Sequence, residues 1–215
     1  MTSHATGNLA PFYQFFETYG SERLNGLNDS HFQGLSAAER EEAWNFLKDR
    51  FEVSDERISG LYRLDPDRAV ALFKEALKQP VEPSPYAASR ESREMCRLLL
   101  LRFVNSVEPD KQYVDAMTQF ASSEFEDVRA QFAASVPIYQ VTQQAVDALK
   151  GMIFTETERI PLASAITQYM VIHGMDFVMD DPLYNSIYMA LRSDDPQKKM
   201  AAMKRLEDHH LPDYA

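Results

Sequence analysis

The stretch DPDRAVALFKEAL, residues 65–77, contains the pattern that decides the fold. Asp65 can accept hydrogen bonds from the open amide groups of a helix start, and proline at the next position loses only a donor that would be unpaired there. The following residues place an apolar stripe on one helical face: Ala69, Val70, Leu72, Phe73, Ala76 and Leu77. The stretch therefore predicts a capped amphipathic helix.

The same signals recur along the chain. An acidic or serine residue precedes proline at Ser84-Pro85, Glu108-Pro109, Asp181-Pro182 and Asp195-Pro196, and Ser36 to Glu39 has the spacing of a capping box. Apolar residues follow at helical spacing, and no segment alternates with period two. We expect helices near residues 9–19, 37–51, 55–64, 66–78, 86–106, 109–121, 124–138, 141–153, 158–173 (ended by Gly174), 182–192 and 196–207.

Beyond residue 85 the expected helices pair into hairpins. Their first helices begin near Ser89, Glu124, Thr157 and Pro196, and steps of 33 to 39 residues are typical of two-helix repeats. One such hairpin cannot bury its apolar stripe alone, so neighbours stack. The sequence predicts an all-α fold of stacked antiparallel helical hairpins in a single domain, 1–215, with capping helices over 1–85, hairpins over 86–207 and a tail over 208–215.

The segment from Glu126 to Ala133, EDVRAQFA, resembles the first helix of a HEAT repeat. The resemblance covers residues 86–207 and implies a short α-α superhelix. Phe132 stands where such a helix often has a smaller residue, and the repeat spacing is uneven, so we expect an irregular superhelix.

The N-terminal part differs in composition. Residues 9–19 contain Phe12, Tyr13, Phe15, Phe16 and Tyr19. We expect this aromatic helix to cap one end of the stack, because an open end would expose apolar surface. The alternative is a separate helix that binds a partner.

The composition excludes some classes of function. The formal net charge is −11 with a pI near 4.9, so phosphate backbones are repelled and a basic protein is the better partner. Acidity that serves only solubility is the alternative. We expect no secretory signal, no membrane span and, because Cys96 has no second cysteine to pair with, a reducing cytoplasmic location.

Motifs for chemistry are missing from the sequence: it has no phosphate-binding glycine loop, no GxSxG and no HExxH. The run from Glu207 to His210 is the one metal-like cluster, and four adjacent helical residues point in different directions, so we interpret it as a solvated tail. We expect His173 to be satisfied in the core and Cys96 to be a packed thiol. We therefore expect no catalytic residues, no metal site and no cofactor.

A partner site is predicted where acidic and aromatic residues mix. From Ile160 to Leu191 the sequence has three aspartates and no lysine or arginine. Carboxylates suit arginine and lysine, and aromatic rings suit desolvated anchors. The predicted partner-binding residues are Asp176, Asp180, Asp181, Tyr184, Asn185 and Tyr188. The alternative is that Asp181 only caps a helix and the tyrosines are core. The acidic turn of residues 122–127 is better explained by the helix dipole.

The fragment from Leu35 to Leu47, LSAAEREEAWNFL, through Gly60-Leu61 is similar to small acidic bacterial immunity proteins of contact-dependent and polymorphic toxin systems. This resemblance implies a protein whose acidic face occludes the active site of a basic nuclease toxin. The sequence itself does not indicate an oligomeric state, and we expect a monomer. Two alternatives stay open: a HEAT-like adaptor or regulatory subunit for another partner, and an enzyme with an unrecognised helical active site.

Overall fold

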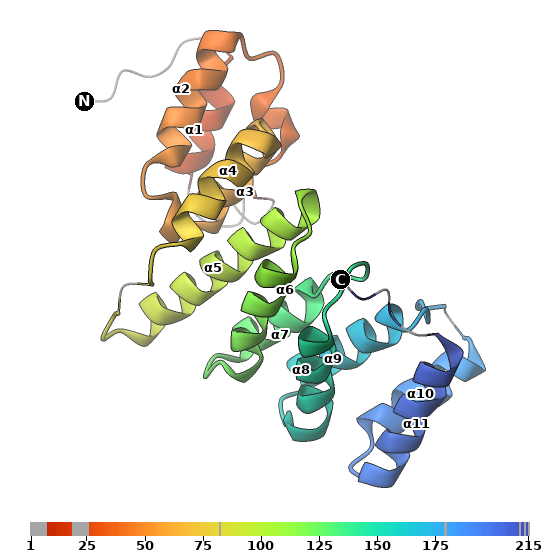
Figure 1. The fold of residues 1–215 in the computed structure, drawn as a ribbon. Helices are drawn as coiled ribbons and strands as arrows, with labels where there is room; N and C mark the ends of the chain where they lie inside the picture. Colours follow the sequence, from red (N-terminus) through yellow and green to blue (C-terminus); the bar gives the residue numbers. More distant parts are fainter. Residues whose placement is uncertain are drawn as a thin grey trace. The chain divides into compact units, whose positions relative to one another are not determined.

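The computed structural model describes residues 8–18, 26–81, 83–178, 180–210, 212 and 214. In these residues the chain forms α-helices, short 3-10 helices and no β-strand; a single isolated bridge joins Val141 and Tyr214. The predicted all-α fold is confirmed (Figure 1).

The chain groups into two compact units, residues 1–103 and 104–215. The border between the two units lies inside α5 (Ala87–Val107). The predicted division into capping helices over 1–85 and hairpins over 86–207 stays a prediction. Whether the chain is one domain stays a prediction. The first unit contains α1 (Ala10–Glu17), η2 (Asp29–Phe32), α2 (Ala37–Lys48), η3 (Phe51–Val53), α3 (Asp55–Leu64), α4 (Pro66–Leu77) and most of α5.

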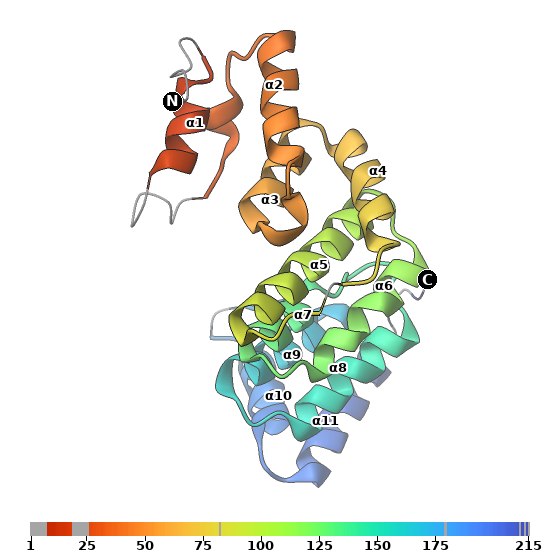
Figure 2. The ribbon, with the colours of Figure 1, turned by 90° about the vertical axis from the view of Figure 1, so that its left-hand side faces the viewer.

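The second unit contains the helices that follow α5. They are α6 (Lys111–Met117), η4 (Thr118–Ser122), α7 (Glu126–Ser135), α8 (Gln143–Thr155), α9 (Arg159–Ile172), α10 (Pro182–Arg192) and α11 (Pro196–His209). In the described residues, α9 packs against α7, α8 and α10, and α10 packs against α11. The last pair lies side by side in both views (Figures 1 and 2). These contacts are compatible with stacked hairpins; the HEAT-like resemblance itself stays a prediction.

Most helix starts follow the capping signals in the sequence. Ser36 and Glu39 form the capping box of α2, and Asp65, Asp181 and Asp195 each accept a backbone N–H at the start of a helix whose first residue is proline. Six of the expected helix starts differ from the observed ones by one or two residues, and two of these lie at the acidic or serine residues that precede proline. The helix expected after Glu108-Pro109 is capped by Asp110 instead, and the helix expected at Ser84-Pro85 begins at Ala87.

The predicted aromatic helix packs into the first unit. Phe12 and Phe15 of α1 are buried, and the Phe12 ring meets Phe32 and Phe46 at centroid distances of 5.8 and 5.5 Å. Such tilted and edge-on contacts suit the charge distribution of the rings. The apolar face of α1 is therefore covered by η2 and α2, while Tyr19, which the prediction included, lies outside the described residues.

No helix in the described part of the chain combines the length and apolarity needed to cross a membrane.

Candidate functional site

The predicted partner-binding segment begins where α9 ends. Gly174 takes a left-handed conformation (φ +74°), its N–H donates to the Val171 carbonyl, and the Met175 N–H donates to the Met170 carbonyl at 2.9 Å. This pair of bonds is the Schellman arrangement, which requires a residue that tolerates positive φ. The predicted helix end at Gly174 is confirmed.

The far end of this loop is fixed by a helix cap. Asp181 is half-buried and its Oδ1 accepts the Leu183 N–H at 2.8 Å, so its carboxylate holds the start of α10. Asp180 lies in the left-handed region at φ +62°, where aspartate is better tolerated than most residues. The capping role that was the alternative for Asp181 is therefore present, whereas Asp180 has no such role in the structure.

The two predicted tyrosines lie in different environments. Tyr184 is 5% exposed, whereas Tyr188 is half-buried and stacks on it with ring planes 13° apart. The Phe177 ring also packs edge-on with Tyr184, at a centroid distance of 5.3 Å. Burial raises the pKa of Tyr184. Tyr184 thus supports the two rings beside it, and little of its own surface reaches a partner.

The exposed part of the segment combines carboxylates with apolar groups. Asp176, Asp180 and Asn185 are exposed, and so are Phe177 and Val178, at 63% and 56%. Within the described chain neither aspartate forms a hydrogen bond or an ion pair. We call Asp176, Phe177, Val178, Asp180, Asn185 and Tyr188 the acidic–aromatic surface. Phe177 and Val178 were missing from the predicted site, although large apolar residues in a loop could have indicated them.

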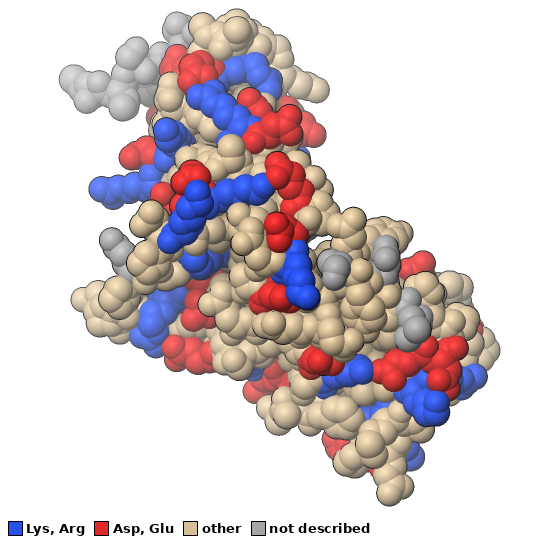
Figure 3. All heavy atoms as spheres, viewed as in Figure 1, with Lys and Arg blue, Asp and Glu red and all other residues tan. Residues whose placement is uncertain are grey.

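Charge is spread unevenly between the two units. Residues 104–215 carry 17 acidic and 9 basic side chains, whereas residues 1–103 carry 16 and 13. The net charges are therefore −8 and −3. On the face drawn in Figure 3, blue and red groups are interspersed over the first unit. The acidic–aromatic surface belongs to the more negative unit.

The predicted tail is tied to the second unit. The Tyr169 hydroxyl donates to Glu207 at 3.0 Å, and Lys150 forms an ion pair with the same carboxylate at 2.5 Å. The His173 Nδ1 lies 2.8 Å from the His210 carbonyl, which can only accept, so Nδ1 carries the proton. The prediction that His173 is satisfied in the core is right for Nδ1, but Nε2 is buried without a partner in the described chain. The solvated-tail interpretation is wrong for Glu207, whose side chain is half-buried and bonded, whereas Asp208, His209 and His210 are exposed.

We expect His173 to make stability depend on pH. Burial lowers the pKa of His173, so the folded chain resists protonation while the unfolded chain takes up a proton below about 6.5. The free energy of unfolding should therefore fall as the pH falls below that value, by at most about 1.4 kcal/mol per pH unit. His173→Gln should reduce this slope in urea unfolding followed by circular dichroism, whereas the exposed His209→Gln should not. Equal slopes in wild type and His173→Gln would contradict the assignment.

The other candidate groups have structural roles. Cys96 is buried, and burial, with the charge of Asp55, raises the pKa of its thiol to about 12, as expected of a packed thiol. Glu126 and Asp127 lie in the first turn of α7, where negative charge complements the helix dipole. Among the described residues no three His, Cys, Asp or Glu side chains are grouped so that they could hold a metal ion.

Comparison of the chain with protein-family models, with curated proteins and with solved structures finds no match.

Proposed function

We propose that the chain is a protein-binding module that recognises a basic protein through the acidic–aromatic surface. The supporting observation is the pair Asp176 and Asp180, two exposed carboxylates that no cation of the described chain neutralises, beside exposed Phe177 and Val178. Carboxylates of this kind can accept charge-assisted hydrogen bonds from arginine or lysine. Apolar groups beside them supply the contact area that anchors an interface.

Within this class we propose inhibition of a basic toxin domain in the cytoplasm, as the resemblance to immunity proteins implies. The mechanism is occlusion: an acidic face covers a cationic active site and excludes its substrate without any chemical step. The net charge of −8 on residues 104–215 favours fast, oriented encounter with such a partner. An adaptor would use the same surface, but it would leave the activity of its partner unchanged.

The structure refines the variants that test this proposal. Asp181 caps α10, so its replacement would cost about 1 kcal/mol of helix stability. This loss could not be separated from a direct effect on binding. Asp176→Lys reverses an exposed charge that has no structural bond in the described chain. Asp194→Lys is the matched control, because Asp194 is an exposed aspartate of the same unit, in the turn between α10 and α11.

The measurement is calorimetric titration with a purified basic toxin domain, taken first from the reading frame next to the gene of this chain. We expect binding that weakens at high salt, and about tenfold weaker binding for Asp176→Lys but not for Asp194→Lys. Asp180→Asn should act in the same direction as Asp176→Lys and keeps a residue that tolerates positive φ. Full toxin activity in the bound state would refute inhibition, and equal effects of both lysine variants would refute the surface.

A further inference from the structure

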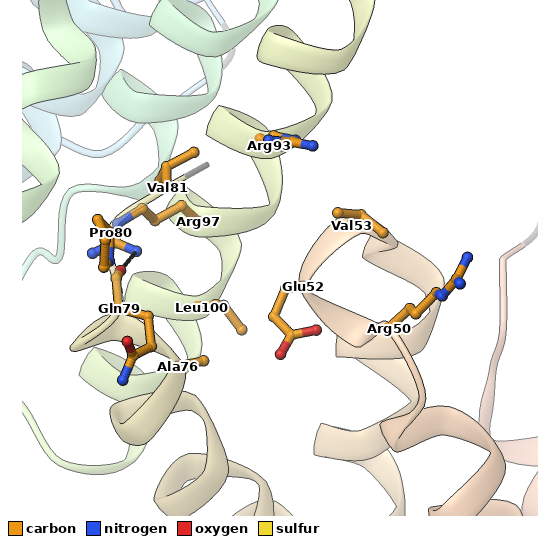
Figure 4. A pocket seen from close by; sticks show the side chains of 10 residues that line it. All are labelled: Arg50, Glu52, Val53, Ala76, Gln79, Pro80, Val81, Arg93, Arg97 and Leu100. Atoms are coloured by element: carbon orange, nitrogen blue, oxygen red, sulfur yellow. Dashed lines mark hydrogen bonds between the residues drawn. The ribbon is translucent and has the colours of Figure 1, made fainter. Parts of the chain in front are cut away.

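The first unit contains a cavity of about 570 Å³, which lies between η3, the end of α4 and α5 (Figure 4). The Arg97 guanidinium, at its wall, donates to the carbonyls of Leu77 at 2.7 Å and Gln79 at 2.9 Å. These bonds satisfy carbonyls that the end of α4 leaves open. Arg93 also lines the cavity, but it points in the opposite direction from Arg97 in Figure 4. The two cations therefore do not converge on one anion, and Arg97 serves the end of α4.

The second unit has an open groove between its last two helices, α10 and α11. Two hollows of about 540 Å³ each lie between these helices, one of them close to the turn that joins the pair. The lining residues that recur at helical spacing are Leu183, Ile187 and Ala190 of α10 and Lys198, Ala201 and Arg205 of α11. Each stripe covers about two helical turns, roughly 10 Å. The groove is therefore long enough for a short helix.

The floor of the groove is apolar. Ile187 is 2% exposed and Met175, at one end, is 8% exposed, whereas Leu183 on the rim is 38% exposed. Ala190 and Ala201 present only methyl groups, so another helix can approach both helices closely. Among the described helices α10 packs against α9 and α11, and the α10–α11 hairpin lies at the end of the second unit in both views (Figures 1 and 2). The groove is thus open to a further helix.

Unpaired cations border the groove. Arg192, Lys198 and Arg205 are exposed, and none of them forms a hydrogen bond or an ion pair within the described chain. Asp208 is the one acidic side chain among the described residues that line the two hollows, and it is already paired with Lys204 at 2.8 Å. In a chain whose net charge is −11, three free cations beside an apolar groove favour an occupant with carboxylates.

We propose that the groove between α10 and α11 binds an amphipathic helix of a partner protein, with one apolar face and acidic flanks. The apolar side chains of that helix pack on Leu183 and Ile187, and its carboxylates accept hydrogen bonds from Lys198 and Arg205. A helix fits better than an extended peptide, because the backbone groups of α10 and α11 are paired within each helix and offer an added strand no partners. The groove shares no residue with the acidic–aromatic surface, so this site is independent of the proposed basic partner.

The test is titration of the full chain with a labelled peptide of about four helical turns, which a hydrocarbon link on its outer face holds helical. The peptide has leucines on one face and glutamates on both flanks. Fluorescence anisotropy measures binding, and amide chemical shifts locate it. We expect a Kd of about 100 μM or below, with shifts at residues 183–190 and 198–208.

Two control peptides test the chemistry of the occupant. One has the same composition with the leucines spread around the helix, and the other has lysine in place of glutamate. Both should bind at least tenfold more weakly, because the first lacks an apolar face and the second is repelled by the cations. Equal binding of either control, or no binding of the acidic peptide up to about 2 mM, would overturn the proposal.

Two charge variants locate the site. Arg205→Glu should weaken binding of the acidic peptide at least tenfold, because it replaces an attractive contact by a repulsive one. Arg159→Glu makes the same change of charge at an exposed position of the same unit that lines neither hollow, and should bind as wild type does. Equal weakening by both variants would show a general charge effect and overturn the assignment.

A third variant tests the groove itself. Ala201 is exposed, so Ala201→Gln keeps the charge and the helix but fills the space between α10 and α11. We expect about tenfold weaker binding, and unchanged binding would show that the peptide contacts the cations alone. Sedimentation of the wild-type chain tests the other occupant: a dimer that Arg205→Glu dissociates would mean that the groove holds a second copy, and would overturn the proposal.

Discussion

Replacing Arg129 by methionine should lower the free energy of unfolding by about 3 kcal/mol. Arg129 of α7 forms a two-pronged ion pair with Glu156, at 2.6 and 3.2 Å, and also donates to the Ser123 carbonyl at 2.9 Å. The two side chains are only 16% and 6% exposed, so the substitution would leave a buried carboxylate without its counter-ion. We expect the low end of the usual range of about 3–5 kcal/mol, because the N–H groups of Thr157 and Glu158 still donate to Glu156.

The double variant Arg129→Met, Glu156→Gln separates charge from packing. The neutral amide still accepts the two backbone N–H groups, so the double variant should recover more than half of the loss. In the wild type, hydrogen bonds from Arg129 and the backbone outweigh burial and hold the pKa of Glu156 below its usual value. That contribution disappears as the pH falls through the folded pKa, so the deficit of the single variant should shrink in acid.

Urea unfolding followed by circular dichroism measures both variants. The exposed Arg159→Met serves as the control and should change stability by less than about 0.5 kcal/mol. A loss for Arg129→Met as small as that of the control would show that the ion pair contributes nothing.

Replacing Phe132 by alanine should lower the free energy of unfolding by about 3–5 kcal/mol. Phe132 is fully buried in α7, the helix that packs against α9 and η4. The loss combines the transfer of a phenyl group to water with the cavity that a rigid core leaves behind. The residue that departs from the HEAT pattern is therefore expected to be one of the main supports of the second unit.

Phe177→Ala is the matched control for size and chemistry. Its ring is 63% exposed and rests edge-on against Tyr184, so we expect a loss below about 1 kcal/mol in the same urea experiment. The same variant should weaken binding of the basic partner, because Phe177 belongs to the acidic–aromatic surface. Equal losses of stability for the two phenylalanine variants would mean that burial does not determine the effect.

Local signals predicted the helices well. The ranges expected for 55–64 and 182–192 are those of α3 and α10, because capping and apolar period act within a few residues. The expected helix 109–121 was less accurate: it divides into α6 and the 3-10 segment η4, and the Thr118 hydroxyl donates to the Asp115 carbonyl at the junction. Hydrogen bonds from side chains to the backbone compete with the backbone hydrogen bonds of an α-helix. The spacing of apolar residues gives no indication of them.

Long-range pairings could not be predicted. The ion pair between Arg129 and Glu156 and the bond between His173 and His210 join residues that are 27 and 37 positions apart. The residues that surround each member of these pairs do not indicate its partner, because the pairing depends on which helices pack against each other. The same reason explains why Tyr184 was expected at the surface: it shares a helical stripe with Tyr188, but Phe177, outside the helix, lies against its ring.

The aromatic core of the first unit gives the chain a built-in optical reporter. Trp44 of α2 is the single tryptophan, and it is 3% exposed. The Arg68 guanidinium lies 4.1 Å from the centre of the Trp44 ring. It also donates two hydrogen bonds to the Glu41 carboxylate, at 2.6 and 2.9 Å. Residues 104–215 have no tryptophan. Tryptophan fluorescence therefore reports the unfolding of residues 1–103 alone. The unfolding midpoint measured by fluorescence equals the midpoint measured by helix content only if the two units unfold together.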